Sequence, residues 1–156
     1  MVAAVGVAQD RSFQRPDWRG VARVLAARPA PGVARAILVQ HYRYMLPLSL
    51  YLPGLRDWPR RGGRPTGAIR VRELDVISIN APHVPLCWWG AACNLTGSRL
   101  QRSYPVPGLR TLWVRHAYQF TVMRLVAAAP IKLTPRVLSQ ALTTTTLGRD
   151  QLLWQR

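Results

Sequence analysis

Four consecutive apolar residues, Ala36-Ile37-Leu38-Val39, constrain the fold more than any other segment. A strand that is apolar on both faces is typical of the centre of a parallel sheet covered by helices on both sides. Residues 2–7 predict a short buried strand before it. Helical spacing between Arg15-Pro16-Asp17 and Ala27 predicts an intervening helix. The first 40 residues therefore predict a strand–helix–strand unit.

The rest of the chain extends this pattern over one domain, residues 1–156. We expect an α/β fold with a mainly parallel central sheet, flanking helices and an antiparallel edge. The expected elements are a helix at 46–52, a strand at 71–79, one or two strands near an edge at 109–127, a helix entered at Thr134-Pro135 and a strand at 152–155. Residues 56–70, rich in Arg, Gly and Pro, and residues 80–107 are expected to be loops. The expected core includes Val24, Leu25, Ile37, Val39, Leu50, Val76 and Leu138.

The charge of the chain is unusual. The chain contains 22 Lys and Arg residues but only six Asp and Glu residues, which gives a net charge of +16. Lys132 is the only lysine. Guanidinium groups bind phosphate and carboxylate through two parallel hydrogen bonds. Nucleic acid, anionic lipid and phosphorylated ligands are therefore the candidate partners. The alternative is that the arginines reflect the codon usage of a GC-rich genome.

No catalytic, cofactor or metal site is predicted. The sequence lacks G-x-G-x-x-G, the P-loop motif and the G-x-S-x-G motif, and its three histidines show no metal-ligand spacing. Glu73 and Asp75 lie two apart on an expected strand, so their side chains share one face. Such a pair can serve acid–base chemistry or hold a metal. In a chain this basic, ion pairing with nearby arginines is the favoured interpretation.

Three further segments bear on function. Arg60-Arg61-Gly62-Gly63-Arg64 resembles a single RGG repeat and is expected to be a flexible connection. Tyr42 and Arg43 are candidate ligand contacts, because aromatic and guanidinium groups stack on bases.

Two adjacent tryptophans lie between the only cysteines of the chain, in the segment Cys87-Trp88-Trp89-Gly90-Ala91-Ala92-Cys93. Trp88 and Trp89 are candidate contacts for a sugar or lipid, although core packing is the default interpretation of two tryptophans in such a segment. Cys87 and Cys93 can form a disulfide or remain free thiols.

Several of these residues resemble a family. Gln14 to Arg19, the strand from Ala36 to Gln40, the Cys87–Cys93 loop, Gln119-Phe120-Thr121 and the region from Leu142 to Leu153 are similar to the C-terminal soluble domain of bacterial polytopic GT-C glycosyltransferases, of the mannosyltransferase and aminoarabinose-transferase-like class. These enzymes transfer sugar from polyprenyl-phosphate donors, and their catalytic acids lie in the membrane part.

The resemblance implies a non-catalytic accessory domain at the cell membrane, on its extracytoplasmic side. Its partners would be the membrane part of the parent transferase and anionic lipid or lipid-phosphate, and the domain would assist donor or acceptor recognition. No catalytic residue carries over, because no apolar run here is long enough to span a membrane. The isolated chain is expected to be inactive. The resemblance also favours a Cys87–Cys93 disulfide. The alternative function is a basic nucleic-acid-binding module.

Overall fold

The computed structural model describes residues 17–26, 34–39, 48–79, 105–117, 120–141 and 151–156. Within them the elements are α2 (Trp18–Leu25), β1 (Arg35–Val39), α3 (Leu48–Tyr51), β2 (Arg56–Asp57), β3 (Arg60–Arg61), β4 (Arg64–Pro65), β5 (Ile69–Ile79), β6 (Arg110–Ala117), β7 (Phe120–Leu133), α4 (Pro135–Ala141) and β8 (Gln151–Gln155). The strand expected at residues 2–7 and most of the loop expected at 80–107 lie outside the described residues.

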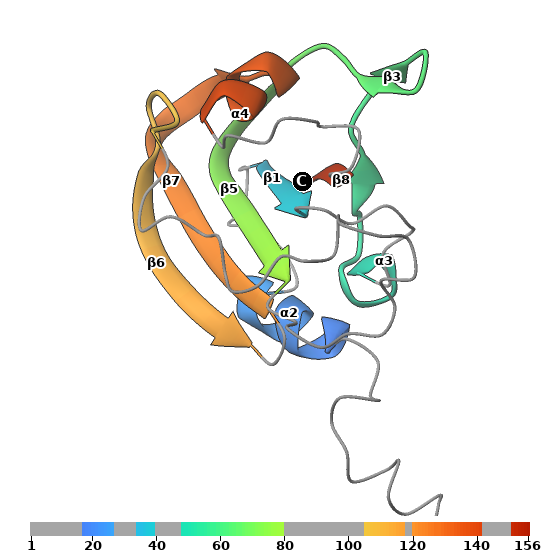
Figure 1. The fold of residues 1–156 in the computed structure, drawn as a ribbon, viewed down its shortest axis with the longest axis vertical. Coiled ribbons are helices and arrows are strands. Elements are labelled where there is room, and N and C mark those ends of the chain that lie inside the picture. The colour runs from blue at the N-terminus through green and yellow to red at the C-terminus, as the bar shows by residue number, and fades with distance from the viewer. Residues whose placement is uncertain (1–16, 27–33, 40–47, 80–104, 118–119, 142–150) are drawn as a thin grey trace, which may run out of the picture.

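One six-stranded mixed sheet, in the order β2-β8-β1-β5-β7-β6, organises these elements (Figure 1). β1 lies inside the sheet and runs parallel to β5, as the apolar run predicted. The expectation of a mainly parallel sheet is wrong, because every other strand pairing in the described part of this sheet is antiparallel. Only residues 118 and 119 separate β6 from β7, and so short a connection can join only antiparallel strands.

The sheet is covered on both faces, which explains the uninterrupted apolar run in β1. Ala36 and Leu38 point into a core that includes Leu138 of α4, whereas Ile37 and Val39 point into a second core built with α2 and α3. Figure 1 shows α2 and α3 near one end of the sheet and α4 near the other. The domain is therefore α/β, with helices on both faces of the sheet.

Most of the expected core is buried. Leu25, Ile37, Val39, Val76 and Leu138 are fully buried, and Val24 is half-buried. The expectation for Leu50 is wrong.

Leu50 is 80% exposed because α3 forms a single turn with buried Leu48 at its start and buried Leu52 directly after it. Residues four apart lie on the same face of a helical turn, so Leu50, midway between them, points to solvent.

α2 begins where the sequence predicted and has a clear capping arrangement. The side chain of Asp17 accepts a hydrogen bond of 2.8 Å from the backbone N–H of Gly20. This bond satisfies one of the N–H groups that the first helical turn leaves without a partner. Trp18, Val21 and Leu25 then recur on the buried face, and the Trp18 ring lies 4.6 Å from that of Phe120 on β7.

Residues 56–70 are not the loop that their composition predicted. They hold β2, the β3–β4 hairpin and the start of β5. Gly62 and Gly63 connect β3 to β4 with φ angles of 55° and 76°. Glycine adopts positive φ without a steric penalty, so the same residues that suggested flexibility form a tight two-residue turn.

Two register shifts bend the long strands. Thr111 pairs with Leu125 and Trp113 pairs with Arg124, so Leu112 of β6 is an extra, bulged residue. In β7, residues 127–130 lie opposite Arg72 alone, and this irregular stretch contains a proline, which cannot donate to a regular ladder. No helix among the described residues is both long and apolar enough to cross a membrane.

Candidate functional site: an arginine-rich surface over a buried charge cluster

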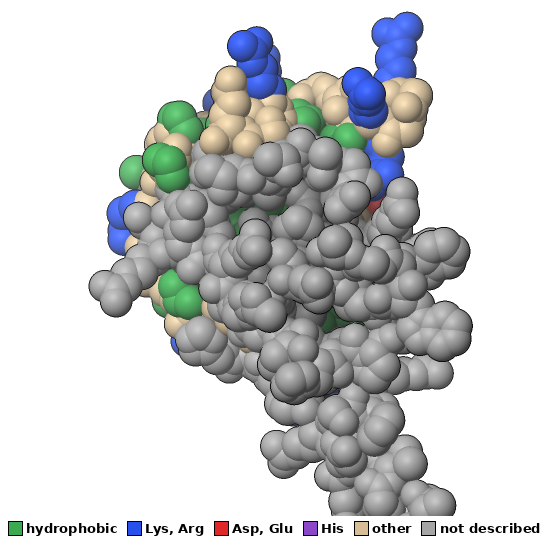
Figure 2. Space-filling model, viewed as in Figure 1, with side chains coloured by type: hydrophobic (Ala, Val, Ile, Leu, Met, Phe, Trp, Pro, Cys, Tyr) green, Lys and Arg blue, Asp and Glu red, His purple; other side chains and the backbone are tan. Residues whose placement is uncertain are grey.

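Exposed basic side chains extend over most of the described elements. We call this set the arginine-rich surface. Figure 2 shows Lys and Arg side chains standing out at the end of the molecule where the β3–β4 hairpin lies, and others along the opposite side. Its exposed members are Arg19, Arg23, Arg56, Arg60, Arg61, Arg64, Arg70, Arg72, Arg110, Arg115, Lys132, Arg136 and Arg156.

The acidic side chains of the described residues do not balance this surface. Asp17 is engaged as the helix cap, and Glu73 and Asp75 bind arginines inside the fold. Asp57 is exposed and accepts a 3.3 Å hydrogen bond from Gln151. The described surface is therefore strongly cationic, and its potential attracts anions.

Two tryptophans lie beside arginines of this surface. The guanidinium carbons of Arg56 and Arg156 lie 5.5 and 5.4 Å from the ring centre of Trp154. The guanidinium carbons of Arg115 and of the partly buried Arg124 lie 4.9 and 4.8 Å from the ring centre of Trp113. These are cation–π distances, so the indoles hold the guanidinium groups in place.

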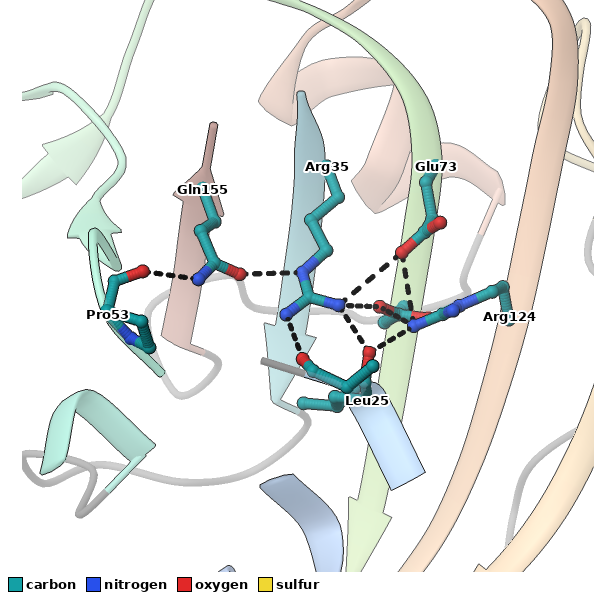
Figure 3. A network of polar contacts seen from close by, with 8 residues as sticks. Leu25, Arg35, Pro53, Glu73, Arg124 and Gln155 are labelled. Carbon is teal, nitrogen blue, oxygen red and sulfur yellow. Dashed lines mark hydrogen bonds and ion pairs between the residues drawn. The ribbon is translucent and has the colours of Figure 1, made fainter. Parts of the chain in front are cut away.

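A buried charge cluster lies beneath, on the face of the sheet that α2 covers (Figure 3). It consists of Arg35 on β1, Glu73 and Asp75 on β5, Arg124 on β7 and Gln155 on β8. Arg35 lies directly opposite both Glu73 and Gln155, and Asp75 lies opposite Arg124. Directly paired residues point to the same face of a sheet, so the register alone brings the five side chains together.

The carboxylates of the cluster are bound mainly by Arg124. Its Nε lies 2.7 Å from Asp75 Oδ1 and its Nη2 lies 3.0 Å from Oδ2, a two-pronged contact. The same Nη2 lies 3.1 Å from Glu73 Oε1. Arg35 Nη1 is more distant, at 3.6 Å from Glu73 and 3.7 Å from Asp75. The ion-pair interpretation of Glu73 and Asp75 is thus confirmed.

Arg35 uses its hydrogen bonds to join three elements. Its Nε donates to Gln155 Oε1 at 2.8 Å, and its two terminal nitrogens donate to the backbone carbonyls of Leu25 and Ala26 at the end of α2. Arg124 also donates to the Leu25 carbonyl, at 2.8 Å. The carbonyl end of a helix carries partial negative charge. The two guanidinium groups there donate to carbonyls that have no partner within the helix, and their positive charge interacts favourably with the helix dipole.

Burial perturbs the acid–base behaviour of the cluster. It raises the pKa of Asp75 to about 7, against the opposing effect of the Arg124 hydrogen bonds and charge. Burial also lowers the pKa of Arg35, an effect that the charges of Asp75 and Glu73 oppose. For Arg124, burial favours the neutral form, but the hydrogen bonds and charge of Asp75 outweigh it and the pKa is raised.

Glu73 Oε1 is buried and lacks a hydrogen bond, although two guanidinium nitrogens lie near it as ion-pair partners. The Asp75 side chain has no exposed surface. In this conformation the Asp75 carboxylate is therefore not accessible to a substrate in solvent. Among the described residues, no three His, Cys, Asp or Glu side chains are grouped as metal ligands.

Tyr42, Arg43, Cys87, Trp88, Trp89 and Cys93, which the sequence singled out, lie outside the described residues. The structure neither brings them together nor separates them. Arg35 is the functional candidate that sequence reasoning missed. An arginine at the start of a strand that is apolar on both faces is itself a signal, because a buried charge requires a partner.

The comparisons with known proteins add no relative. No protein-family model, curated protein or solved structure matches this chain.

Proposed function

We propose that this chain is a non-catalytic domain that binds phosphate-bearing anions through its arginine-rich surface. One observation carries the proposal: the described carboxylates cap a helix, pair with arginine inside the fold or bind Gln151, whereas arginines populate the exposed surface. Exposed guanidinium groups favour phosphate because their planar forks match its oxygens.

The resemblance to GT-C enzymes suggests a setting for this binding. In that setting the chain is an accessory domain of a membrane glycosyltransferase, lies on the extracytoplasmic side of the cell membrane and recognises the phosphate of a polyprenyl-phosphate donor or of anionic lipid. This part of the proposal rests on the sequence motifs and on the phosphate chemistry of the donor. Such a domain supplies binding, while the membrane part supplies the catalytic acids.

A basic nucleic-acid-binding module is the second candidate. The two tryptophans that lie beside arginines, Trp113 and Trp154, favour it, because aromatic rings and guanidinium planes are the groups on which bases stack. The exposed basic side chains are spread over α2, β2 to β7, α4 and the C-terminal end, which is the arrangement that compositional bias predicts, whereas a dedicated nucleic-acid binder would cluster them on one face.

A two-arm binding experiment on the purified chain tests the proposal. One arm measures sedimentation with neutral vesicles, with anionic vesicles and with vesicles containing a polyprenyl phosphate. The other measures binding to duplex and single-stranded oligonucleotides from 0.05 to 0.3 M salt. We expect binding to at least one phosphate-bearing ligand that weakens steeply with salt. No binding to any of them at low salt would refute the proposal.

The non-catalytic part of the proposal has its own test. Incubation of the purified chain with a polyprenyl-phosphate sugar and candidate acceptors should yield no turnover above that of a buffer control. Sustained sugar transfer by the chain alone would show that catalytic groups lie within it.

A further inference from the structure

The β3–β4 hairpin presents three arginines at an open tip. Arg60 and Arg61 form β3, Arg64 begins β4, and Gly62 and Gly63 make the two-residue turn with positive φ at both positions. Side-chain atoms built on either glycine would meet nothing within 4 Å. Figure 1 shows the hairpin standing away from the main sheet, so the tip is accessible.

The base of the hairpin is fixed to the core. Trp58 is 1% exposed, and its backbone N–H donates to the Leu152 carbonyl of β8 at 3.0 Å. Its indole N–H donates to the carbonyl of Thr66 at 2.9 Å, across the hairpin, and the Thr66 N–H donates to Pro59 at 2.8 Å. A buried indole and a closed hydrogen-bond ring therefore fix the base of the hairpin that carries the arginines.

The two arginines next to the turn repel one another. Arg61 and Arg64 are directly paired across the strands, both exposed. Like charges directly opposite on one face destabilise a hairpin. The ion pairs of the described residues use Glu73 and Asp75 in the buried cluster, away from this tip. An anion held between the two guanidinium groups would remove the repulsion and satisfy both sets of donors.

We propose that the β3–β4 hairpin is a phosphate-binding finger that enters a groove of double-stranded nucleic acid, with Arg61 and Arg64 gripping one backbone phosphate. The inference rests on the phosphate binding of the proposed function and deepens its nucleic-acid candidate. A two-stranded β-ribbon fits the major groove of B-form DNA, and the glycine turn allows close approach. A lipid surface is the weaker fit, because residues 60–65 offer no apolar side chain larger than proline for insertion.

The test measures binding of the full chain to a fluorescent 20-base-pair duplex across a salt series. The variant is Arg61→Ala/Arg64→Ala. The control is Arg19→Ala/Arg23→Ala, which removes the same charge from exposed positions on α2. Each phosphate contact contributes about 0.9 to the slope of log affinity against log salt. Because the two arginines bind one phosphate, we expect the hairpin variant to lose about 0.9 from that slope and at least about tenfold in affinity at 0.1 M salt, while the control changes far less.

The melting temperature of each variant without ligand shows whether a loss of binding comes from a loss of folding. The hairpin variant should melt no lower than the parent chain, because it loses a like-charge pair and no packing. If the parent binds the duplex and the hairpin variant binds as tightly as the control, the hairpin is not the site. If the parent binds only anionic vesicles, the nucleic-acid partner is wrong and the proposed function stands. If it binds neither, the proposed function itself fails.

Discussion

At the scale of single residues, Arg35 has the largest structural role of any charged side chain in the described region. It is fully buried, and it contacts the end of α2, the acids of β5 and Gln155 of β8. The pairing of Glu73 and Asp75 with arginine could be predicted, because residues two apart on a strand share a face. The identity of their partners could not, because these come from strands distant in sequence, and register sets which side chains meet.

The pH dependence of stability tests the state of Asp75. Its pKa of about 7 in the folded chain exceeds the ordinary value of 3.8. Between these values the folded chain holds a proton that the unfolded chain has lost. The stabilisation is therefore complete below about pH 4 and is lost as the pH rises to about 7, with a slope of up to about 1.4 kcal/mol per pH unit.

Asp75→Asn should remove that slope from the free energy of unfolding, measured by urea denaturation at several pH values. Asp57→Asn is the matched control, because Asp57 is an exposed carboxylate. It should leave the slope unchanged. An Asp75→Asn profile that parallels the parent would show that Asp75 does not titrate in this range.

Arg35→Met should be strongly destabilising. It leaves Glu73 with one guanidinium partner and leaves the Leu25 and Ala26 carbonyls with fewer donors. Breaking a buried ion pair from one side typically costs about 3–5 kcal/mol. Adding Glu73→Gln to this variant should recover part of the loss. The neutral amide replaces a carboxylate that has lost one of its guanidinium partners, so less uncompensated charge is buried. A loss below about 1 kcal/mol in urea unfolding would contradict this role for Arg35.

At the scale of elements, α2, α3, β1 and β5 could be predicted closely, because each has a local signal: helical spacing, a Pro-Gly stop, an apolar run, or alternation. The β3–β4 hairpin could not. The hairpin depends on glycines at positive φ, and a Gly-rich segment has the same composition whether it forms a turn or a flexible connection. What decides between them is the buried Trp58, which joins the base of the hairpin to Leu152, far along the chain.

Gly20→Ala tests the cap of α2. Alanine favours a helix over glycine by about 1 kcal/mol. A Cβ at position 20, however, would collide with the carboxylate of Asp17 and displace the cap, which is itself worth about 1 kcal/mol. The two effects should cancel, so Gly20→Ala alone should leave the stability nearly unchanged.

In the background of Asp17→Ala, where no cap remains to be displaced, Gly20→Ala should stabilise the chain by about 1 kcal/mol. Urea unfolding of the two single variants and the double variant forms a complete cycle. Additive effects would mean that the collision is relieved at no cost to the cap.

At the scale of the whole molecule, the α/β class could be predicted and the sheet topology could not. Hydrophobic patterning shows which faces are buried, but strand direction depends on connections whose path the pattern does not specify. The antiparallel β5–β7 and β1–β8 pairings insert strands that a simple parallel winding would not contain. The charge asymmetry could be predicted, whereas its distribution over many elements required the fold.

The proposed extracytoplasmic setting predicts a redox state for the whole chain. Cys87 and Cys93 lie outside the described residues, and their disulfide remains a prediction. Five intervening residues allow the closure, which would stabilise the chain by about 2 kcal/mol in the loop-length account. In chain prepared in an oxidising compartment, both thiols should resist alkylation until reduction, as read by mass spectrometry. Two thiols alkylated without reduction would count against the disulfide and against this setting.

The bulge at Leu112 has a consequence for how β6 can change in length. Leu112 is the one surplus residue between the Thr111–Leu125 and Trp113–Arg124 pairs. Its deletion would restore a regular ladder and keep Trp113 over Arg124. Deletion of Val114 would instead turn every following side chain of the strand to the opposite face. Natural length variation in β6 is therefore expected to concentrate at Leu112, where the loss of one residue leaves Trp113 in place over the charge cluster.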